Sequence, residues 1–282
     1  MTIASQLIRP MTPADPEPAA DLLRRGDFGD RLGFFQWAIG RPTIRAFVAE
    51  DEGRIIGTGV ASAHGRAGWV GVIYVEPAFR GGGLGRRITR TVIEHLEANG
   101  VRSMLLIASP MGRPVYEREG FTVLDRQVRF TIDGLSPADT PPDPRLRPFA
   151  ARDLATVLEL DRVVTGEDRS AVLRELVEPV STTVALGPDG DVRGYLVRAP
   201  WRGGAVIAPD PDDALRLLER RRHSTGISGL AGAGVLASNE AGRARLRAAG
   251  WTEEMGGVRM IRGEPLDWNP NGIWGQLNGA LG

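Results

Sequence analysis

The fold of this chain is decided by residues 70–85, which read VGVIYVEPAFRGGGLG. Val70 to Val75 is a short apolar run rich in β-branched residues, and this composition predicts a buried strand that ends before Pro77. Beyond residue 85 an amphipathic helix is predicted, ending before Gly100, because apolar residues recur at every fourth position: Leu84, Ile88, Val92 and Leu96.

Between the predicted strand and helix lie four glycines in five positions, at residues 81, 82, 83 and 85. Glycine lets the main chain turn tightly and direct several N–H groups at one point, where the dipole of the following helix also favours negative charge. Arg80, Arg86 and Arg87 add positive charge around the same loop. The pattern therefore predicts a binding site for a diphosphate group.

Two nucleotide-binding loops can be set aside. A P-loop requires a lysine after its last glycine, and the chain contains no lysine. A dinucleotide fingerprint requires glycine at the position of Ile88 and usually lies on an early strand of a parallel sheet, whereas the preceding residues read as antiparallel hairpin strands. What remains is Arg80-x-x-Gly83-x-Gly85 after a strand that ends Val75-x-Pro77, and this resembles the acetyl-CoA-binding motif of the GNAT N-acetyltransferase superfamily.

A second motif follows the helix and a further predicted strand over residues 103–108. Residues 116–121 read YEREGF, and this Tyr-x-x-x-Gly-Phe pattern resembles the second GNAT signature, in which a short helix carries the tyrosine. The resemblance implies that two central strands splay apart and admit the pantetheine arm of acetyl-CoA. Carried over by position, it implies these cofactor-binding residues: Ile73, Tyr74, Val75, Arg80, Gly81, Gly82, Gly83, Leu84, Gly85, Arg86 and Ser109.

The same resemblance gives Tyr116 the role of general acid. Acyl transfer to an amine expels CoA as a thiolate, which a phenol near the sulfur can protonate, while the N–H of Val75 can donate to the tetrahedral oxyanion. Many members of the superfamily have asparagine where this chain has Ser109, and those with a side-chain base often have a carboxylate at one of the positions held here by Trp69 and Met104. No base is therefore identified, and the titratable residues nearby in sequence are His64, Glu76, Glu117 and Glu119.

Residues 27–42 are aromatic and lack clear periodicity. In GNAT proteins the equivalent region usually forms a wall of the acceptor pocket, so these residues are a candidate substrate surface. Their rings can equally belong to the core: Phe28, Phe34, Phe35 and Trp37.

Composition excludes several other classes of protein. The 282 residues are 42% hydrophobic and 25% charged, which suits a globular protein of one large domain or two smaller ones. Basic and acidic residues balance at 35 each, so no net field favours a nucleic-acid partner. The lack of cysteine excludes disulfides, cysteine-ligated metals and an acyl-cysteine intermediate, and we expect no metal. No signal peptide or membrane span is recognised, so we expect a cytoplasmic protein that acts without a membrane.

After a proline-rich stretch, the sequence patterns of the first half are repeated in the second half. Leu146-Arg147-Pro148 repeats Ile8-Arg9-Pro10, the hairpin pattern of residues 46–62 returns over residues 182–198, and Gly250-Trp251 matches Gly120-Phe121. We therefore predict an α/β (α+β) protein of tandem GNAT folds, each a mixed, mostly antiparallel twisted sheet flanked by helices. The predicted domains are a catalytic copy at residues 1–135, a linker at 136–146 and a degenerate copy at 147–282.

The second copy lacks the residues that the chemistry needs. Residues 208–214 read APDPDDA in place of the glycine loop, an acidic sequence that repels a diphosphate, and Leu246 stands at the tyrosine position. This order resembles a bacterial group of two-domain GNAT proteins, which also have a sequence close to Gly166-Glu167-Asp168-Arg169. Arg169 either faces the acceptor cleft or forms a local ion pair with Glu167 or Asp168. We expect one CoA per chain.

These patterns predict an N-acyltransferase that transfers an acetyl group from acetyl-CoA to a primary amine of a small molecule or peptide. With no cysteine available, direct attack in a ternary complex is favoured. Two alternatives are a longer acyl donor, carried by CoA or a carrier protein, and a non-catalytic CoA-binding sensor. We expect a monomer or homodimer.

Overall fold

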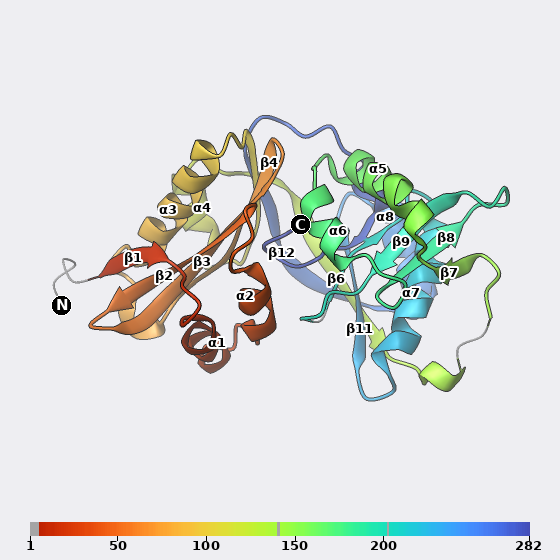
Figure 1. The fold of residues 1–282 in the computed structure, drawn as a ribbon, viewed down its shortest axis with the longest axis horizontal. Coiled ribbons are helices and arrows are strands. Elements are labelled where there is room, and N and C mark those ends of the chain that lie inside the picture. Colours follow the sequence, from red (N-terminus) through yellow and green to blue (C-terminus); the bar gives the residue numbers. More distant parts are fainter. Residues whose placement is uncertain (1–5, 140–141, 202) are drawn as a thin grey trace. The chain divides into compact units, whose positions relative to one another are not determined.

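The computed structural model describes residues 6–139, 142–201 and 203–282. Thr140 and Pro141 of the predicted linker lie outside these residues. The chain forms two compact units (Figure 1). Unit 1 consists of Met1–Thr122, Met260–Pro265 and Gly279–Gly282, and unit 2 consists of Val123–Arg259 and Leu266–Asn278. Each unit therefore contains residues from both halves of the sequence, and the predicted domain boundaries stay a prediction.

Unit 1 is built on a twisted sheet with the strand order β1-β2-β3-β4-β5, and the end of β12 lies beside β5. Its strands up to β4 pair antiparallel, whereas β4 and β5 pair parallel. The bounds are β1 Leu7–Pro10, β2 Ile44–Asp51, β3 Arg54–His64, β4 Ala67–Val75, β5 Ser103–Ala108 and β12 Thr252–Gly263. The mixed, mostly antiparallel sheet predicted from the sequence is confirmed.

Helices flank this sheet, with α3 and α4 on one side and α1 and α2 on the other (Figure 1). Their bounds are α1 Pro16–Arg25, α2 Leu32–Ala38, α3 Leu84–Ala98 and α4 Arg113–Arg118, and the 3-10 helix η2 spans Pro77–Phe79. The apolar stripe of α3 is buried as its spacing predicts, because Leu84, Ile88, Val92 and Leu96 are each at most 1% exposed. The sequence reading missed α2, since a helix of seven residues is too short to show a 3.6-residue period.

Unit 2 has a five-stranded sheet in the order β13-β10-β9-β8-β7 and, in addition, an antiparallel pair of β6 and β11. The bounds are β6 Thr122–Asp133, β7 Leu146–Pro148, β8 Thr182–Leu186, β9 Val192–Val197, β10 Val206–Ile207, β11 Leu230–Leu236 and β13 Ile273–Gly275. The helices are α5 Leu154–Thr165, α6 Ser170–Leu176, α7 Pro211–Thr225 and α8 Glu240–Ala248, with 3-10 helices η3 Pro137–Asp139, η4 Ala151–Asp153 and η5 Pro270–Gly272. Phe130, Leu217, Leu246 and Trp274 belong to its core.

The repeat seen in the sequence recurs in the hydrogen bonds of the two units. In unit 1 the guanidinium of Arg9 donates two hydrogen bonds to Asp15, of 2.7 and 3.0 Å, and in unit 2 Arg147 donates two to Asp153, of 2.6 and 2.8 Å. Each carboxylate also accepts the main-chain N–H of the residue three positions before it. The hydrogen bonds from Arg9 lower the pKa of Asp15 to about 2 despite its partial burial. Two copies of one fold account for this identical local geometry.

None of the helices in the described residues is long and apolar enough to span a bilayer.

Candidate active site

The centre of the candidate site is an open edge of β4. The pairing between β4 and β5 covers Ala67–Trp69 and Ser103–Leu105, and beyond Trp69 the described strand pairs only with β3. Tyr74 lies opposite Thr58, and the N–H of Glu76 donates to the carbonyl of Ile56 at 2.9 Å. Because main-chain groups alternate between the two edges of a strand, Ile73 and Val75 direct their N–H groups to the open side.

A strained residue lies in β4 three positions beyond Trp69, the last residue that pairs with β5. Val72 has a φ of +50°, a region that a β-branched residue rarely adopts. The hydroxyl of Thr58 donates to the Val72 carbonyl at 2.8 Å and holds the bulge on one side. Gly71 is approached closely by the end of the chain, since a Cβ at this position would lie 2.5 Å from Ala280. The bulge is thus held by two independent contacts within unit 1.

The glycine loop leads directly into α3. Gly83 is the N-cap residue with a φ of +81°, and a Cβ added at Gly81, Gly82 or Gly83 would meet nothing within 4 Å. The first N–H groups of a helix have no carbonyl partner within the helix, so those of Leu84, Gly85 and Arg86 are available to an anion in the space before the loop. This geometry fits a diphosphate group.

Two arginines predicted to contact the cofactor have partners in unit 1. Arg80 donates from Nε to the carbonyl of Val75 at 2.9 Å, and its Cζ lies 5.5 Å from the centre of the Tyr74 ring. Arg86 donates from Nε to Glu119 at 2.5 Å, and Arg90 is 3.3 Å from the same carboxylate. Burial alone would raise the pKa of Glu119, but the hydrogen bonds from these two arginines outweigh it and lower the pKa. The Glu119 ion pairs therefore tie α3 to the end of α4.

The short helix α4 presents Tyr116. Its N-terminus is held by Ser109, whose hydroxyl accepts the N–H of Gly112 at 3.1 Å. The Tyr116 side chain is buried and packs edge-on against Phe121, with ring centres 6.1 Å apart. Burial raises the pKa of Tyr116 to about 12, and no described residue accepts or donates a hydrogen bond at its hydroxyl. Tyr116 therefore carries a proton at neutral pH that is available for transfer.

The titratable residues near these motifs do not provide an obvious base. Glu76 pairs with Arg54, and Glu117 pairs with Arg113 at 2.7 Å. His64 is buried and lies opposite Ala67, seven residues along β3 from the position opposite Val75. At a rise of about 3.3 Å per residue this is roughly 23 Å along the strand. His64 is thus too far from the open part of β4 to act there directly.

The aromatic segment of residues 27–42 divides between the two predicted roles. Phe34 and Phe35 are at most 1% exposed and belong to the core, whereas Phe28 is 38% exposed. The ring of Phe28 lies 5.5 Å from the ring of Tyr74 on β4. Phe28 and the partly buried Trp37 are thus the rings of this segment that remain candidates for contact with an acceptor.

In unit 2 the strand that corresponds to β4 has no open edge. The short β10 precedes α7 as β4 precedes α3, but it pairs with β9 on one side and with β13 on the other. Val206 lies opposite Gly275, and Ile207 lies opposite Ile273. The position where a pantetheine arm would pair with the main chain is therefore filled by the protein's own strand.

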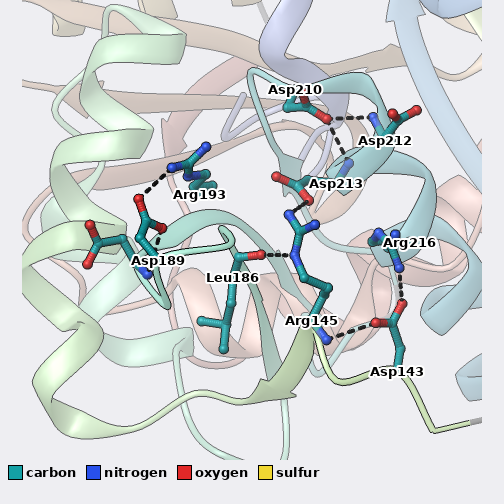
Figure 2. Close-up of polar contacts among 10 residues, drawn as sticks. Asp143, Arg145, Leu186, Asp189, Arg193, Asp210, Asp212, Asp213 and Arg216 are labelled. Carbon is teal, nitrogen blue, oxygen red and sulfur yellow. Dashed lines mark hydrogen bonds and ion pairs between the residues drawn. The ribbon is translucent and has the colours of Figure 1, made fainter.

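In unit 2, side chains of the protein also occupy the N-terminus of α7, which corresponds to the diphosphate site of unit 1 (Figure 2). Asp210 caps α7, because its Oδ1 accepts the N–H groups of Asp212 at 2.8 Å and Asp213 at 3.1 Å. Asp213 pairs with Arg145 at 2.8 Å, and Arg145 also donates to the carbonyl of Leu186. A carboxylate thus occupies the end of the helix at which a diphosphate would bind. At the tyrosine position the fully buried Leu246 packs into the core and offers no hydroxyl.

Arg169 lies in a buried cluster of unit 2. It donates to Asp161 from Nε at 3.0 Å and from Nη2 at 2.5 Å, and Tyr195 donates its hydroxyl to the same carboxylate. Both Arg169 and Asp161 are 1% exposed. The partner predicted from the sequence was Glu167 or Asp168, whereas the structure gives Arg169 a hydrogen-bonded pair with Asp161 on the preceding helix α5.

Comparison with known proteins identifies an acetyltransferase (GNAT) domain in each half of the chain. Models of the acetyltransferase (GNAT) domain match residues 42–123 and residues 157–275. A crystal structure of a Pyrococcus horikoshii protein, proposed to be an acetyltransferase, superposes on 100% of this chain and 98% of its own with a TM-score of 0.82 at 19% identity. A GCN5-related N-acetyltransferase from Sphaerobacter thermophilus matches 95% of this chain and 100% of its own with a TM-score of 0.64, also at 19% identity.

Proteins with sequences similar to this one match smaller parts of the chain. An uncharacterized N-acetyltransferase of Bacillus subtilis, YitH, is 28% identical over 55% of this chain and 56% of its own. A glucosamine 6-phosphate N-acetyltransferase of Trypanosoma brucei brucei is 27% identical over 45% of this chain and 86% of its own. A mycothiol acetyltransferase of Streptomyces avermitilis is 33% identical over 31% of this chain and 30% of its own. The chain thus spans about half the length of the Bacillus relative.

Proposed function

The chain belongs to the GNAT acetyltransferase family, with one copy of the fold in each half, and from this premise we propose that its first copy transfers an acetyl group from acetyl-CoA to an amine. The observation that carries this proposal is the open edge of β4 beside the glycine loop. In our proposal the pantetheine arm pairs with Ile73, Tyr74 and Val75. The diphosphate lies before Gly81 to Arg86.

The proposed reaction uses two groups of unit 1, the main-chain N–H of Val75 and the hydroxyl of Tyr116. The amine attacks the thioester carbonyl, and the oxyanion that forms is stabilised by the N–H of Val75, which the alternation of β4 directs to the open side. The C–S bond then breaks, the sulfur leaves as a thiolate, and the nitrogen releases its extra proton to solvent water, which in turn reprotonates the Tyr116 phenolate after each cycle. Tyr116, protonated because burial raises its pKa, gives that sulfur a proton. Ser109 and Glu119 hold α4, so they position Tyr116 without touching the reacting atoms.

The acceptor in this proposal is a primary amine of a small molecule or peptide. The names of two relatives, glucosamine 6-phosphate N-acetyltransferase and mycothiol acetyltransferase, support a small-molecule acceptor. The half-exposed Phe28 next to Tyr74 supports an acceptor that enters from the side of residues 26–31. Direct attack in a ternary complex is supported by the lack of cysteine in the chain.

Release of free thiol from acetyl-CoA, measured over a library of primary amines, tests the proposal. We expect release that depends on the amine, and a product heavier by one acetyl group in mass spectrometry. Butyryl-CoA run in parallel reports whether a longer acyl chain is preferred. If acetyl-CoA binds and no amine in the library increases thiol release with either donor, the chain is a CoA-binding sensor and the proposed transfer is wrong.

A further inference from the structure

A cavity in unit 2 lies at the opposite end of α7 from the aspartate cluster of Figure 2. It has a volume of about 860 Å³ and is lined by the loop that follows β9, the last turn of α7 and the start of β11. This volume falls in the range of small-molecule sites. Two arginines, Arg198 and Arg221, line it, and none of the described lining residues is a carboxylate.

Arg221 is fixed in place at the cavity wall. Its Nη1 donates to the carbonyl of Gly232 at 2.9 Å, and its Nη2 donates to the carbonyl of Gly204 at 2.7 Å. Burial and, to a smaller extent, the positive charge of Arg198 lower the pKa of Arg221 to about 10. The guanidinium therefore remains charged at neutral pH and lies within electrostatic reach of a second guanidinium.

This pair differs from several other arginines of the unit. Arg145, Arg147, Arg169 and Arg216 each pair with an aspartate. Arg198 and Arg221 have no carboxylate partner among the described residues, and a second positive charge near the buried guanidinium of Arg221 is unfavourable. The two carbonyls and the C-terminal end of α7 compensate Arg221, but Arg198 has neither. An anion in the cavity would pair with Arg198 and lower the repulsion between the two guanidinium groups.

The rest of the lining selects the kind of anion. The hydroxyls of Ser224 and Thr225 each donate to the Arg221 carbonyl at 2.9 Å. A hydroxyl that donates in this way keeps lone pairs to accept from a ligand. The cavity is also much larger than a phosphate ion. We propose that this cavity of unit 2 binds a phosphate monoester of a small polyhydroxylated molecule, with the phosphate between Arg198 and Arg221 and the ligand hydroxyls toward Ser224 and Thr225.

Titration calorimetry on the full chain with glucose 6-phosphate, inorganic phosphate and glucose tests this site. We expect glucose 6-phosphate to bind at one per chain, phosphate to bind more weakly and glucose to show no binding. Arg198→Gln should weaken binding of glucose 6-phosphate about tenfold or more, as the loss of a charged hydrogen bond implies. Arg198 is exposed, so this variant should keep the melting temperature of the wild type.

Arg193→Gln is the matched control, because Arg193 lies on β9, is exposed and already pairs with Asp189. This variant should bind glucose 6-phosphate as the wild type does. No binding of glucose 6-phosphate at millimolar concentration, or equal affinity in Arg198→Gln and the wild type, would overturn the site. Phosphate binding as tightly as glucose 6-phosphate would overturn the role of the ligand hydroxyls. The site is independent of CoA binding in unit 1, so failure here leaves the proposed transfer reaction untouched.

Discussion

A chain that ends after Asp139 is expected neither to fold stably nor to bind acetyl-CoA, although it contains every residue of the candidate active site. Unit 1 is completed by Met260–Pro265 and Gly279–Gly282, which such a fragment lacks. It would lose the hydrogen bond of 3.0 Å from the Glu264 N–H to the main-chain carbonyl of Arg102. It would also lose the hydrogen bond from the Ser62 hydroxyl to the Ala280 carbonyl. It would also lose the fully buried side chains of Met260 and Leu281.

The size of these losses decides the outcome. Burial of each large apolar side chain contributes roughly 1.5–3 kcal/mol, and a domain has only about 5–15 kcal/mol of net stability. Circular dichroism and thermal melting of the fragment should therefore show no cooperative transition. When the fragment is refolded together with residues 142–282, we expect a 1:1 complex with restored acetyl-CoA binding. A fragment that melts and binds acetyl-CoA like the full chain would show that the segments from the second half are dispensable.

Replacing Tyr116 by phenylalanine should lower kcat by about 10²-fold, the usual contribution of one general acid or base. The acetyl-CoA affinity should change little, because the ring and its packing against Phe121 are kept. Tyr74→Phe is the matched control: Tyr74 also lies beside the site, but in our account it acts through its main chain and should retain full kcat. The assay is thiol release with the best amine of the library.

The pH dependence gives a second test of the same role. An acid must be protonated to act, and the pKa of about 12 keeps Tyr116 protonated well above neutral pH. Tyr116 should therefore stay protonated between pH 7 and 10, and its ionisation should not lower the wild-type kcat in this range. Unchanged turnover in Tyr116→Phe would mean that the thiolate leaves without help from this residue.

Local patterns in the sequence predicted much of the first copy. Strand β5 has the bounds predicted from the sequence, residues 103–108, and the apolar stripe of α3 is buried where its spacing placed it. These features depend on residues close in sequence, so periodicity and breakers such as Pro77 and Gly100 are enough to identify them. The recognition of two GNAT copies followed from motifs of the same local kind.

Features set by distant segments were not predicted. The bulge at Val72 places a β-branched residue at positive φ, against its local preference, and is held by Thr58 and by Ala280 from the far end of the chain. The closure of β10 by β13 joins residues more than sixty positions apart. The assignment of residues 260–265 to unit 1 likewise depends on partners in β5 and the residues before it. No short window of sequence contains these pairings.

The central claim is that the chain binds acetyl-CoA in its first copy alone. In the second copy β13 covers the edge of β10, and Asp210 caps the helix where the diphosphate would lie.

Calorimetric titration of the full chain with acetyl-CoA tests this directly, together with Gly83→Asp and the control Gly190→Asp. Both glycines have positive φ and open space around the position of a Cβ, so the two substitutions carry a similar backbone cost of about 1–2 kcal/mol. We predict one acetyl-CoA per chain for the wild type and for Gly190→Asp, and none for Gly83→Asp. Two acetyl-CoA molecules per chain, or wild-type affinity in Gly83→Asp, would contradict the account.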